Sequence, residues 1–192
     1  GKARGRAFQA RKLRLAMNIM KAGGDGVIVA FKIPGTVADA IAVPGGEAAV
    51  DLHLTLAYLG ARSAWSDDEL KILYRTIGEH ARGTPPLVGT ISGAGRFDAA
   101  GCVYASVNAP GLSAFRERVV RALDSAGIDV SERFDFDPHV TLTYADGAEV
   151  PNMPSLEFAL DTLCVYAGDE RAEVKLDGQL QAIDMPNADP RV

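Results

Sequence analysis

Histidine, cysteine, tryptophan and long apolar runs are all scarce in this chain. Its 192 residues include three histidines, two cysteines and one tryptophan. Cys102 and Cys164 lie far apart in apolar stretches without the spacing of a metal site, which predicts buried free thiols and a reducing, cytoplasmic location. No apolar run approaches the roughly 20 residues that cross a bilayer, and the start lacks the pattern of a signal peptide. The sequence therefore argues against a disulfide scaffold and against a membrane span.

Positive charge is concentrated at the start of the chain. Residues 1–23 contain seven Lys or Arg and no acidic residue, so the chain's net charge of −5 leaves −12 on residues 24–192. We expect residues 1–23 to form a basic amphipathic arm that packs on the body or remains from a longer polypeptide. Contact with another protein, a nucleic acid or a membrane surface is the alternative. The acidic body is expected to bind long nucleic acid poorly, because that affinity depends on neutralising phosphates.

Short β-branched runs alternate with amphipathic stretches along residues 24–184. Their periodicities and turn signals predict strands at 27–31, 52–59, 87–91, 102–107, 139–144, 156–166 and 171–176, and helices at 36–42, 66–82 and 110–126. The glycine-rich stretch 92–98 is predicted to be a turn, and residues 185–192 a loose tail. Mixed content with short connections indicates an α+β fold with antiparallel sheets.

One hexapeptide pattern, His-x-Thr-Leu-x-Tyr, occurs twice. The first copy is residues 53–58 and the second is residues 139–144, and His80 is the only other histidine. The repetition predicts two similar lobes that face each other. We therefore expect a bilobal α+β domain over residues 24–184, in which antiparallel sheets line a central cleft and helices cover the outer faces.

Strand alternation divides each copy between two faces. Side chains at every second position share a face, so His53, Thr55 and Ala57 should oppose Leu54, Leu56 and Tyr58. In the second copy His139, Thr141 and Thr143 should likewise oppose Val140, Leu142 and Tyr144. The apolar set must meet the helices, which would leave the histidines and threonines in the cleft and both tyrosines in the core.

Two imidazoles and two hydroxyls in one cleft suit phosphodiester cleavage. A neutral imidazole can accept a proton from the attacking oxygen while a protonated one donates to the leaving oxygen, because the ordinary pKa of histidine lies near 6.5. The threonine hydroxyls can bind the non-bridging phosphate oxygens. Two alternatives to catalysis stay open: hydrogen-bonded structural histidines, and a zinc site that would need His80 as a third ligand. For His80 itself, an interaction with a helix C-terminus is the simplest interpretation.

The two His-x-Thr copies resemble the motifs of the 2H phosphoesterase superfamily, and their surroundings resemble its LigT-like branch of RNA 2′,5′-ligases and 2′,3′-cyclic phosphodiesterases. The stretch from His53 to Gly60 is similar to that branch's first motif, and Pro138 to Leu142 to its second. The resemblance covers about residues 26–176. It implies catalysis by His53, Thr55, His139 and Thr141 without a metal or other cofactor.

The same resemblance leaves the substrate open, because family members act on 2′,3′-cyclic phosphates, 2′,5′ linkages and cyclic oligonucleotides. A small nucleotide or short oligonucleotide fits the acidic body better than long RNA. Further candidate substrate contacts, each also compatible with a structural role, are Arg96, Phe97, Arg133, Phe134, Phe136 and Thr143.

We therefore predict a metal-independent phosphodiesterase that uses a histidine pair as acid and base. Two alternative functions remain at this point. One is a nucleotide-binding or assembly module without catalysis, within a larger polypeptide, and the other is an RNA 2′,5′-ligase or end-repair enzyme.

Overall fold

The computed structural model describes residues 24–131 and 135–177. The predicted arm (1–23), the candidates Arg133 and Phe134, and the predicted tail (185–192) lie outside these ranges. No helix in the described ranges is long and apolar enough to cross a membrane.

The described residues form strands and helices close to the predicted positions. The strands are β1 (Gly26–Lys32), β2 (His53–Ala61), β3 (Leu87–Phe97), β4 (Cys102–Asn108), β5 (His139–Thr143), β6 (Leu156–Leu160), β7 (Thr162–Ala167) and β8 (Glu170–Lys175). The helices are α2 (Gly35–Ile41), α3 (Asp67–Ala81) and α4 (Leu112–Ser125), with 3-10 turns η1 (Ala49–Asp51) and η2 (Arg62–Ala64). The predicted α+β class is confirmed.

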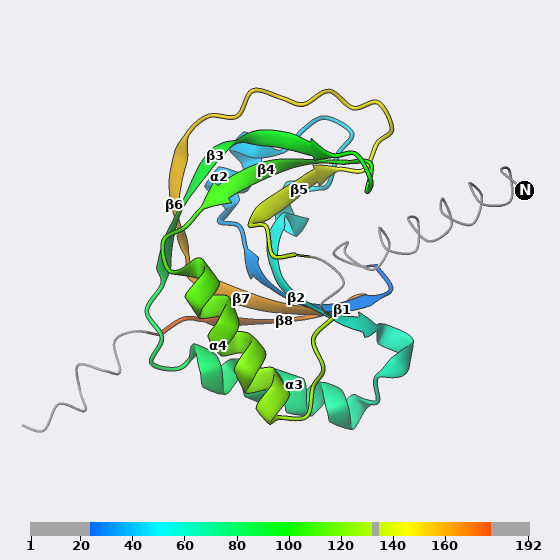
Figure 1. Ribbon diagram of the computed structural model, residues 1–192, viewed down its shortest axis with the longest axis vertical. Helices are drawn as coiled ribbons and strands as arrows, with labels where there is room; N and C mark the ends of the chain where they lie inside the picture. The colour runs from blue at the N-terminus through cyan, green and yellow to red at the C-terminus, as the bar shows by residue number, and fades with distance from the viewer. Residues whose placement is uncertain (1–23, 132–134, 178–192) are drawn as a thin grey trace, which may run out of the picture.

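Within the described ranges the strands make one curled antiparallel sheet in the order β6-β3-β4-β5-β2-β1-β7-β8 (Figure 1). The two motif strands, β5 and β2, are neighbours at its centre and are joined in the register at one pair, Leu54 and Val140. The sheet is thus continuous, and each motif strand lies at the inner edge of its four-strand half; the division into two lobes around a cleft stays a prediction.

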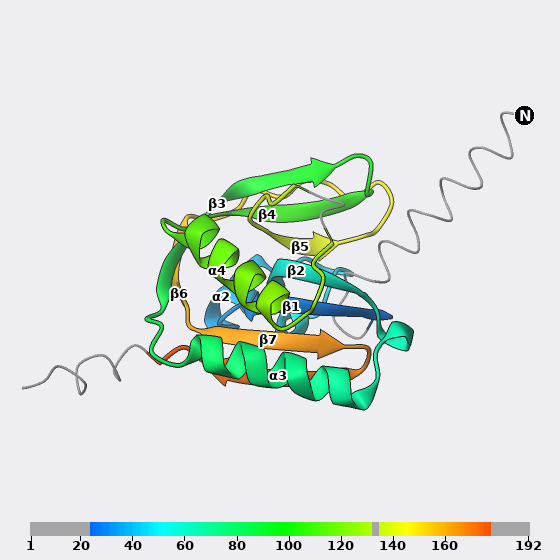
Figure 2. The ribbon, with the colours of Figure 1, turned by 60° about the horizontal axis from the view of Figure 1, so that its bottom comes forward.

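Helices α3 and α4 lie side by side against the same side of the sheet (Figure 2). Each carries an apolar stripe at helical spacing that is buried. The start of α3 is fixed by a capping box, in which the Ser66 hydroxyl accepts from the Glu69 N–H and the Glu69 carboxylate accepts from the Ser66 N–H. The helices therefore leave the opposite side of the sheet for the site.

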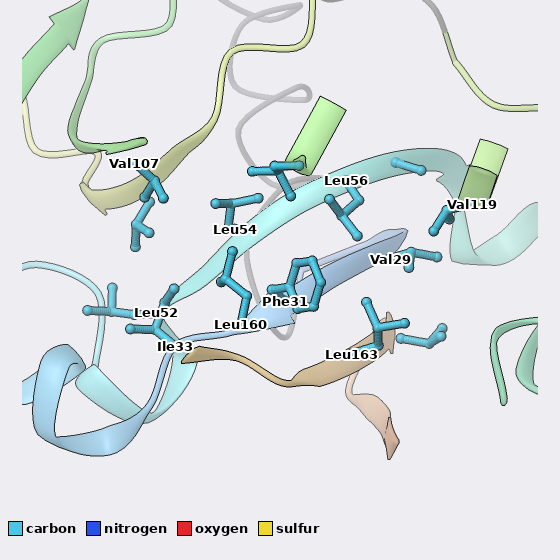
Figure 3. Packing of buried hydrophobic residues seen from close by; sticks show 14 of the residues in the cluster. Val29, Phe31, Ile33, Leu52, Leu54, Leu56, Val107, Val119, Leu160 and Leu163 are labelled. Atoms are coloured by element: carbon cyan, nitrogen blue, oxygen red, sulfur yellow. The ribbon is translucent and has the colours of Figure 1, made fainter. Parts of the chain in front are cut away.

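The main core lies between the helices and the sheet. Phe31 of β1 and Phe115 of α4 pack with ring centroids 5.1 Å apart, and Figure 3 shows aliphatic side chains of β1, β2 and β7 around Phe31. Leu54 and Val140, the two residues that join the motif strands, are fully buried in this core. Packing thus fixes which face of each motif strand turns away from the helices.

The predicted glycine-rich turn at 92–98 is instead the second part of β3. Gly95 pairs with Tyr104 of β4, and a Cβ at Gly95 would come within 2.6 Å of the Tyr104 hydroxyl and 2.7 Å of its ring. Glycine here allows an aromatic ring to lie over the neighbouring strand, rather than marking a turn. The chain reverses after Phe97, at residues 98–101.

His80 corrects a second expectation. It lies in the last turn of α3, where a helix dipole favours a positive charge. However, its ring packs edge-on against Phe115 at 5.4 Å, its Nε2 is buried without a hydrogen-bond partner, and burial followed by the charge of Arg118 lowers its pKa. The neutral imidazole acts as a packing residue between α3 and α4.

This environment makes folding stability depend on pH. Because the pKa of His80 is lower in the folded chain than in the unfolded chain, the unfolded chain binds more protons as the pH falls through about 6.5. The contribution of the neutral His80 side chain to the free energy of unfolding is thus fully present above that pH and is lost as the pH falls below it. We expect His80→Gln to show a smaller decrease in unfolding free energy between pH 7 and pH 5 than the parent, measured by denaturant titration. Equal decreases would contradict this role.

Candidate active site

The four predicted catalytic residues lie on one face of the central strands. Leu54 and Val140 point together into the core, so the residues on either side of them, His53 and Thr55 in β2 and His139 and Thr141 in β5, point to the opposite face. In an antiparallel register this places each histidine beside the other strand's threonine. The two histidines are then diagonal neighbours, a relation that separates side chains by roughly 7–8 Å.

Both histidines are anchored in the same way. His53 Nδ1 lies 2.7 Å from the carbonyl oxygen of Asp51, and His139 Nδ1 lies 2.6 Å from that of Asp137. A carbonyl oxygen can only accept a hydrogen bond, so Nδ1 must carry the proton in each ring. This arrangement leaves Nε2 of each neutral imidazole as the position that exchanges a proton.

His139 is surrounded by aromatic rings of the second half of the sheet. Its ring contacts Phe97 at 4.9 Å and Tyr104 at 5.5 Å, both edge to face, and Phe97 stacks on Tyr104 at 4.1 Å. Burial among these groups lowers the pKa of His139, and the carbonyl and charge of Asp137 oppose this only in part. His139 is thereby held neutral near pH 7, in the form that accepts a proton.

His53 lies over a small apolar cluster in the first half of the sheet. The cluster consists of Ile28, Ala30, Cys164 and Tyr166, with Tyr58 packed against it. The His53 and Tyr166 rings are 5.0 Å apart. The Tyr166 hydroxyl is buried beside the Cys164 thiol, and burial raises the pKa of Cys164 to about 11. This side of the site therefore presents neutral groups beneath the imidazole.

The tyrosine of each motif does not follow the predicted alternation. In β2, Thr55 pairs with Ala30 but Ala57 pairs with Val29, so Leu56 is an extra residue. This bulge turns Tyr58 back to the His53 face and Ala57 into the helix-side core. The prediction that Tyr58 opposes His53 is wrong for this reason.

The second motif strand has an equivalent bulge. Thr141 pairs with Tyr104 and Thr143 with Val103, which makes Leu142 the extra residue. The Tyr144 phenol forms a hydrogen bond with the Thr141 hydroxyl, and burial raises the pKa of the phenol. Like Tyr58, Tyr144 therefore lies on the side of the sheet that carries the histidines instead of in the helix-side core.

The remaining sequence candidates differ in whether they lie near the histidine pair. Phe97 contacts His139. Arg96 pairs with Val103, whose side chain is in the core, so Arg96 points away from His139. Thr143 is only 5% exposed and accepts from the Ala145 N–H, and Phe136 lies under the Arg116 guanidinium at 4.8 Å. The structure thus brings only Phe97 of these four to the histidine pair.

Sequence reasoning missed Tyr104 and Tyr166, the other rings beside the histidines. The sequence pattern around each of them is weak, because each is a single aromatic residue in a predicted strand. Which residues lie beside it depends on the order of the strands in the sheet. In the described part of the chain, no three His, Cys, Asp or Glu residues are grouped so that they could hold a metal ion. His80 lies on the helix side of the sheet, away from the other two histidines.

This fold agrees with the resemblance to the LigT-like branch of the 2H phosphoesterase superfamily. The chain belongs to the 2′-5′ RNA ligase superfamily, whose family model matches residues 42–177. A comparison with curated protein sequences gives no significant match.

Solved structures show the same fold. The crystal structure of TT0787 of Thermus thermophilus is similar with a TM-score of 0.60 and 21% identity, over 79% of this chain and 95% of that one. The structure of Escherichia coli LigT complexed with 3′-AMP is similar with a TM-score of 0.59 and 23% identity, over 80% and 95%.

Proposed function

We propose that this protein is a metal-independent phosphodiesterase that cleaves small nucleotides or short oligonucleotides with His53 and His139 as acid and base. The observation that carries this proposal is the pair of equivalent histidines. Each is fixed through Nδ1 to a carbonyl two residues earlier, and each is followed by a threonine on the same face. Membership of the 2′-5′ RNA ligase superfamily supports phosphodiesterase or ligase chemistry.

We assign the base to His139, because burial favours its neutral form. Its Nε2 would accept a proton from a water molecule whose oxygen attacks the phosphorus. His53, in its protonated form, would give its Nε2 proton to the leaving ribose oxygen as that phosphorus–oxygen bond breaks. Thr55 and Thr141 would donate hydrogen bonds to the non-bridging oxygens, where negative charge increases in the transition state.

The substrate class follows from what surrounds the pair. Phe97 and Tyr104 offer stacked rings at His139 for a nucleobase, and the acidic body disfavours long RNA. The crystal structures of E. coli LigT with 3′-AMP, NADP⁺ and ATP support a small nucleotide ligand here as well.

The deciding experiment is a substrate panel in EDTA, analysed by mass spectrometry. It contains 2′,3′-cyclic nucleotides, 2′,5′-oligoadenylate, cyclic dinucleotides and a structured RNA. We expect cleavage of at least one of the small nucleotides, with product masses that sum to the substrate mass plus one water. Binding without turnover would instead identify a non-catalytic module. Turnover restricted to structured RNA, with binding that falls steeply from 50 to 200 mM salt, would identify a ligase or end-repair enzyme.

Phe97 provides a test of nucleobase stacking. Replacing Phe97 by alanine removes one ring of the stack beside His139. Because base–aromatic stacking is worth about 1–3 kcal/mol per base, we expect KM for a cyclic nucleotide to rise about 5- to 150-fold. Phe97→Tyr, which keeps a ring, should retain most of the affinity. Similar KM values for Phe97→Ala and the parent would contradict stacking at this position.

A further inference from the structure

Asp51 connects His53 to the edge strand β8. Its backbone carbonyl accepts the His53 Nδ1–H at 2.7 Å. Its carboxylate oxygen Oδ1 accepts from Arg171 Nη2 of β8, also at 2.7 Å. The residue that fixes the tautomer of His53 is therefore itself held by an ion pair from a strand 120 residues later in the chain.

Arg171 also contacts the aromatic ring on which His53 packs. Arg171 and Tyr166 are directly opposite each other in the β7–β8 pair, and the guanidinium lies 5.3 Å from the Tyr166 ring centroid. The Tyr166 ring in turn packs 5.0 Å from the His53 ring. Arg171 thus restrains the imidazole both through Asp51 and through Tyr166.

Among the residues that the structure describes, the second histidine has no equivalent support. His139 has the same carbonyl contact, to Asp137, but its ring packs on Phe97 and Tyr104. Among the described residues, no cation forms an ion pair with Asp137. The charged support therefore distinguishes His53 from His139 within an otherwise symmetric pair.

Stability alone does not account for this ion pair. The Arg171 and Asp51 side chains are 38% and 29% exposed, and ion pairs this exposed contribute little to folding. Reaction rates, in contrast, depend steeply on the orientation of an acid or base. An ion pair that is weak for folding can therefore matter for the geometry of the imidazole it supports.

We propose that Arg171 and Asp51 are positioning residues for His53, which keep its Nδ1 protonated and direct its Nε2 to the substrate. This inference rests on the proposed phosphodiester chemistry, in which His53 Nε2 must point at the leaving oxygen to donate its proton. Arg171 is not required to touch the substrate.

The test compares Arg171→Gln with the parent on 2′,3′-cyclic AMP. We expect kcat to fall about 10-fold, on the scale on which small misplacements reduce rates, with KM within about 2-fold of the parent. Arg171→Lys, which keeps the charge, should recover part of kcat. The double variant Asp51→Asn, Arg171→Gln should be no slower than the slower single variant, because the two residues act as one unit.

Lys175→Gln is the matched control. Lys175 lies on the same strand and pairs with Asp161 at 3.0 Å, and we expect its variant to keep the parent kcat. Equal losses in Lys175→Gln and Arg171→Gln, or an unchanged kcat in Arg171→Gln, would overturn the proposal.

A second measurement separates this inference from the proposed function. In ¹⁵N-labelled protein without substrate, the neutral His53 ring should carry its proton on Nδ1 in the parent and Lys175→Gln. A mixture of tautomers is expected in Arg171→Gln. A protein that cleaves no substrate but shows this difference would refute the phosphodiesterase assignment and keep the positioning role. Identical tautomers in parent and Arg171→Gln would refute the positioning role, whatever the activity.

Discussion

His139→Ala is expected to lower kcat on a cyclic nucleotide about 10²–10⁴-fold, the usual contribution of a general acid or base. The variant removes the Nε2 that we assign as proton acceptor. In the parent, this base works in its neutral form, and burial places its pKa below the ordinary value of 6.5. On the acidic side of the pH profile, where His139 becomes protonated, we therefore expect the parent's kcat/KM to fall only at pH values below about 6.5.

Two further variants separate chemistry from folding. His139→Asn can still donate a hydrogen bond to the Asp137 carbonyl from a position near Nδ1, but it lacks Nε2, so it should be as slow as His139→Ala. His80→Gln removes the histidine of α3, which packs on Phe115 on the helix side, and should keep the parent kcat. A His139→Asn variant with near-parental kcat would contradict the assignment of Nε2 as the base.

Thr141→Val is expected to lower kcat about 10²–10³-fold, the usual cost of removing one hydrogen-bond donor to a developing oxyanion. Valine keeps the β-branched shape of threonine, so the change is confined to the hydroxyl. Measurement of kcat and KM separately should show the loss mainly in kcat, because the hydroxyl is proposed to bind the transition state more tightly than the ground state.

Thr162→Val serves as the control for this substitution. Thr162 is a buried threonine of β7, two strands from β2 in the sheet and outside both motifs, and its hydroxyl donates to the Asp161 carboxylate. We expect some loss of stability and an unchanged kcat. If Thr141→Val were to retain the parent kcat at full folding, the hydroxyl would have no part in catalysis.

The elements and the face that carries both histidines could be predicted because they depend on local patterns. The capping box at Ser66 and the apolar stripes specify α3 and α4 wherever they pack. The alternation of His53, Leu54 and Thr55 specifies two faces, and only the apolar one can meet the helices. These features need no knowledge of which strand lies next to which.

The features that could not be predicted depend on pairing between distant strands. The bulges at Leu56 and Leu142 arise from register shifts against β1 and β4, and they reverse the expected facing of Tyr58 and Tyr144. Arg171 approaches Asp51 only because β8 joins the sheet beyond β7. A single sequence contains the residues of these contacts but not the register that joins them.

The proposed mechanism requires that His53 and His139 together cleave a phosphodiester without a metal. It is tested by single-turnover cleavage of 2′,3′-cyclic nucleotides in excess EDTA, by the parent and by the His53→Ala, His139→Ala double variant. We predict full parental cleavage in EDTA and none above the uncatalysed rate in the double variant, with both proteins equally folded by circular dichroism. Loss of parental activity in EDTA, or cleavage by the double variant at the parental rate, would contradict the mechanism.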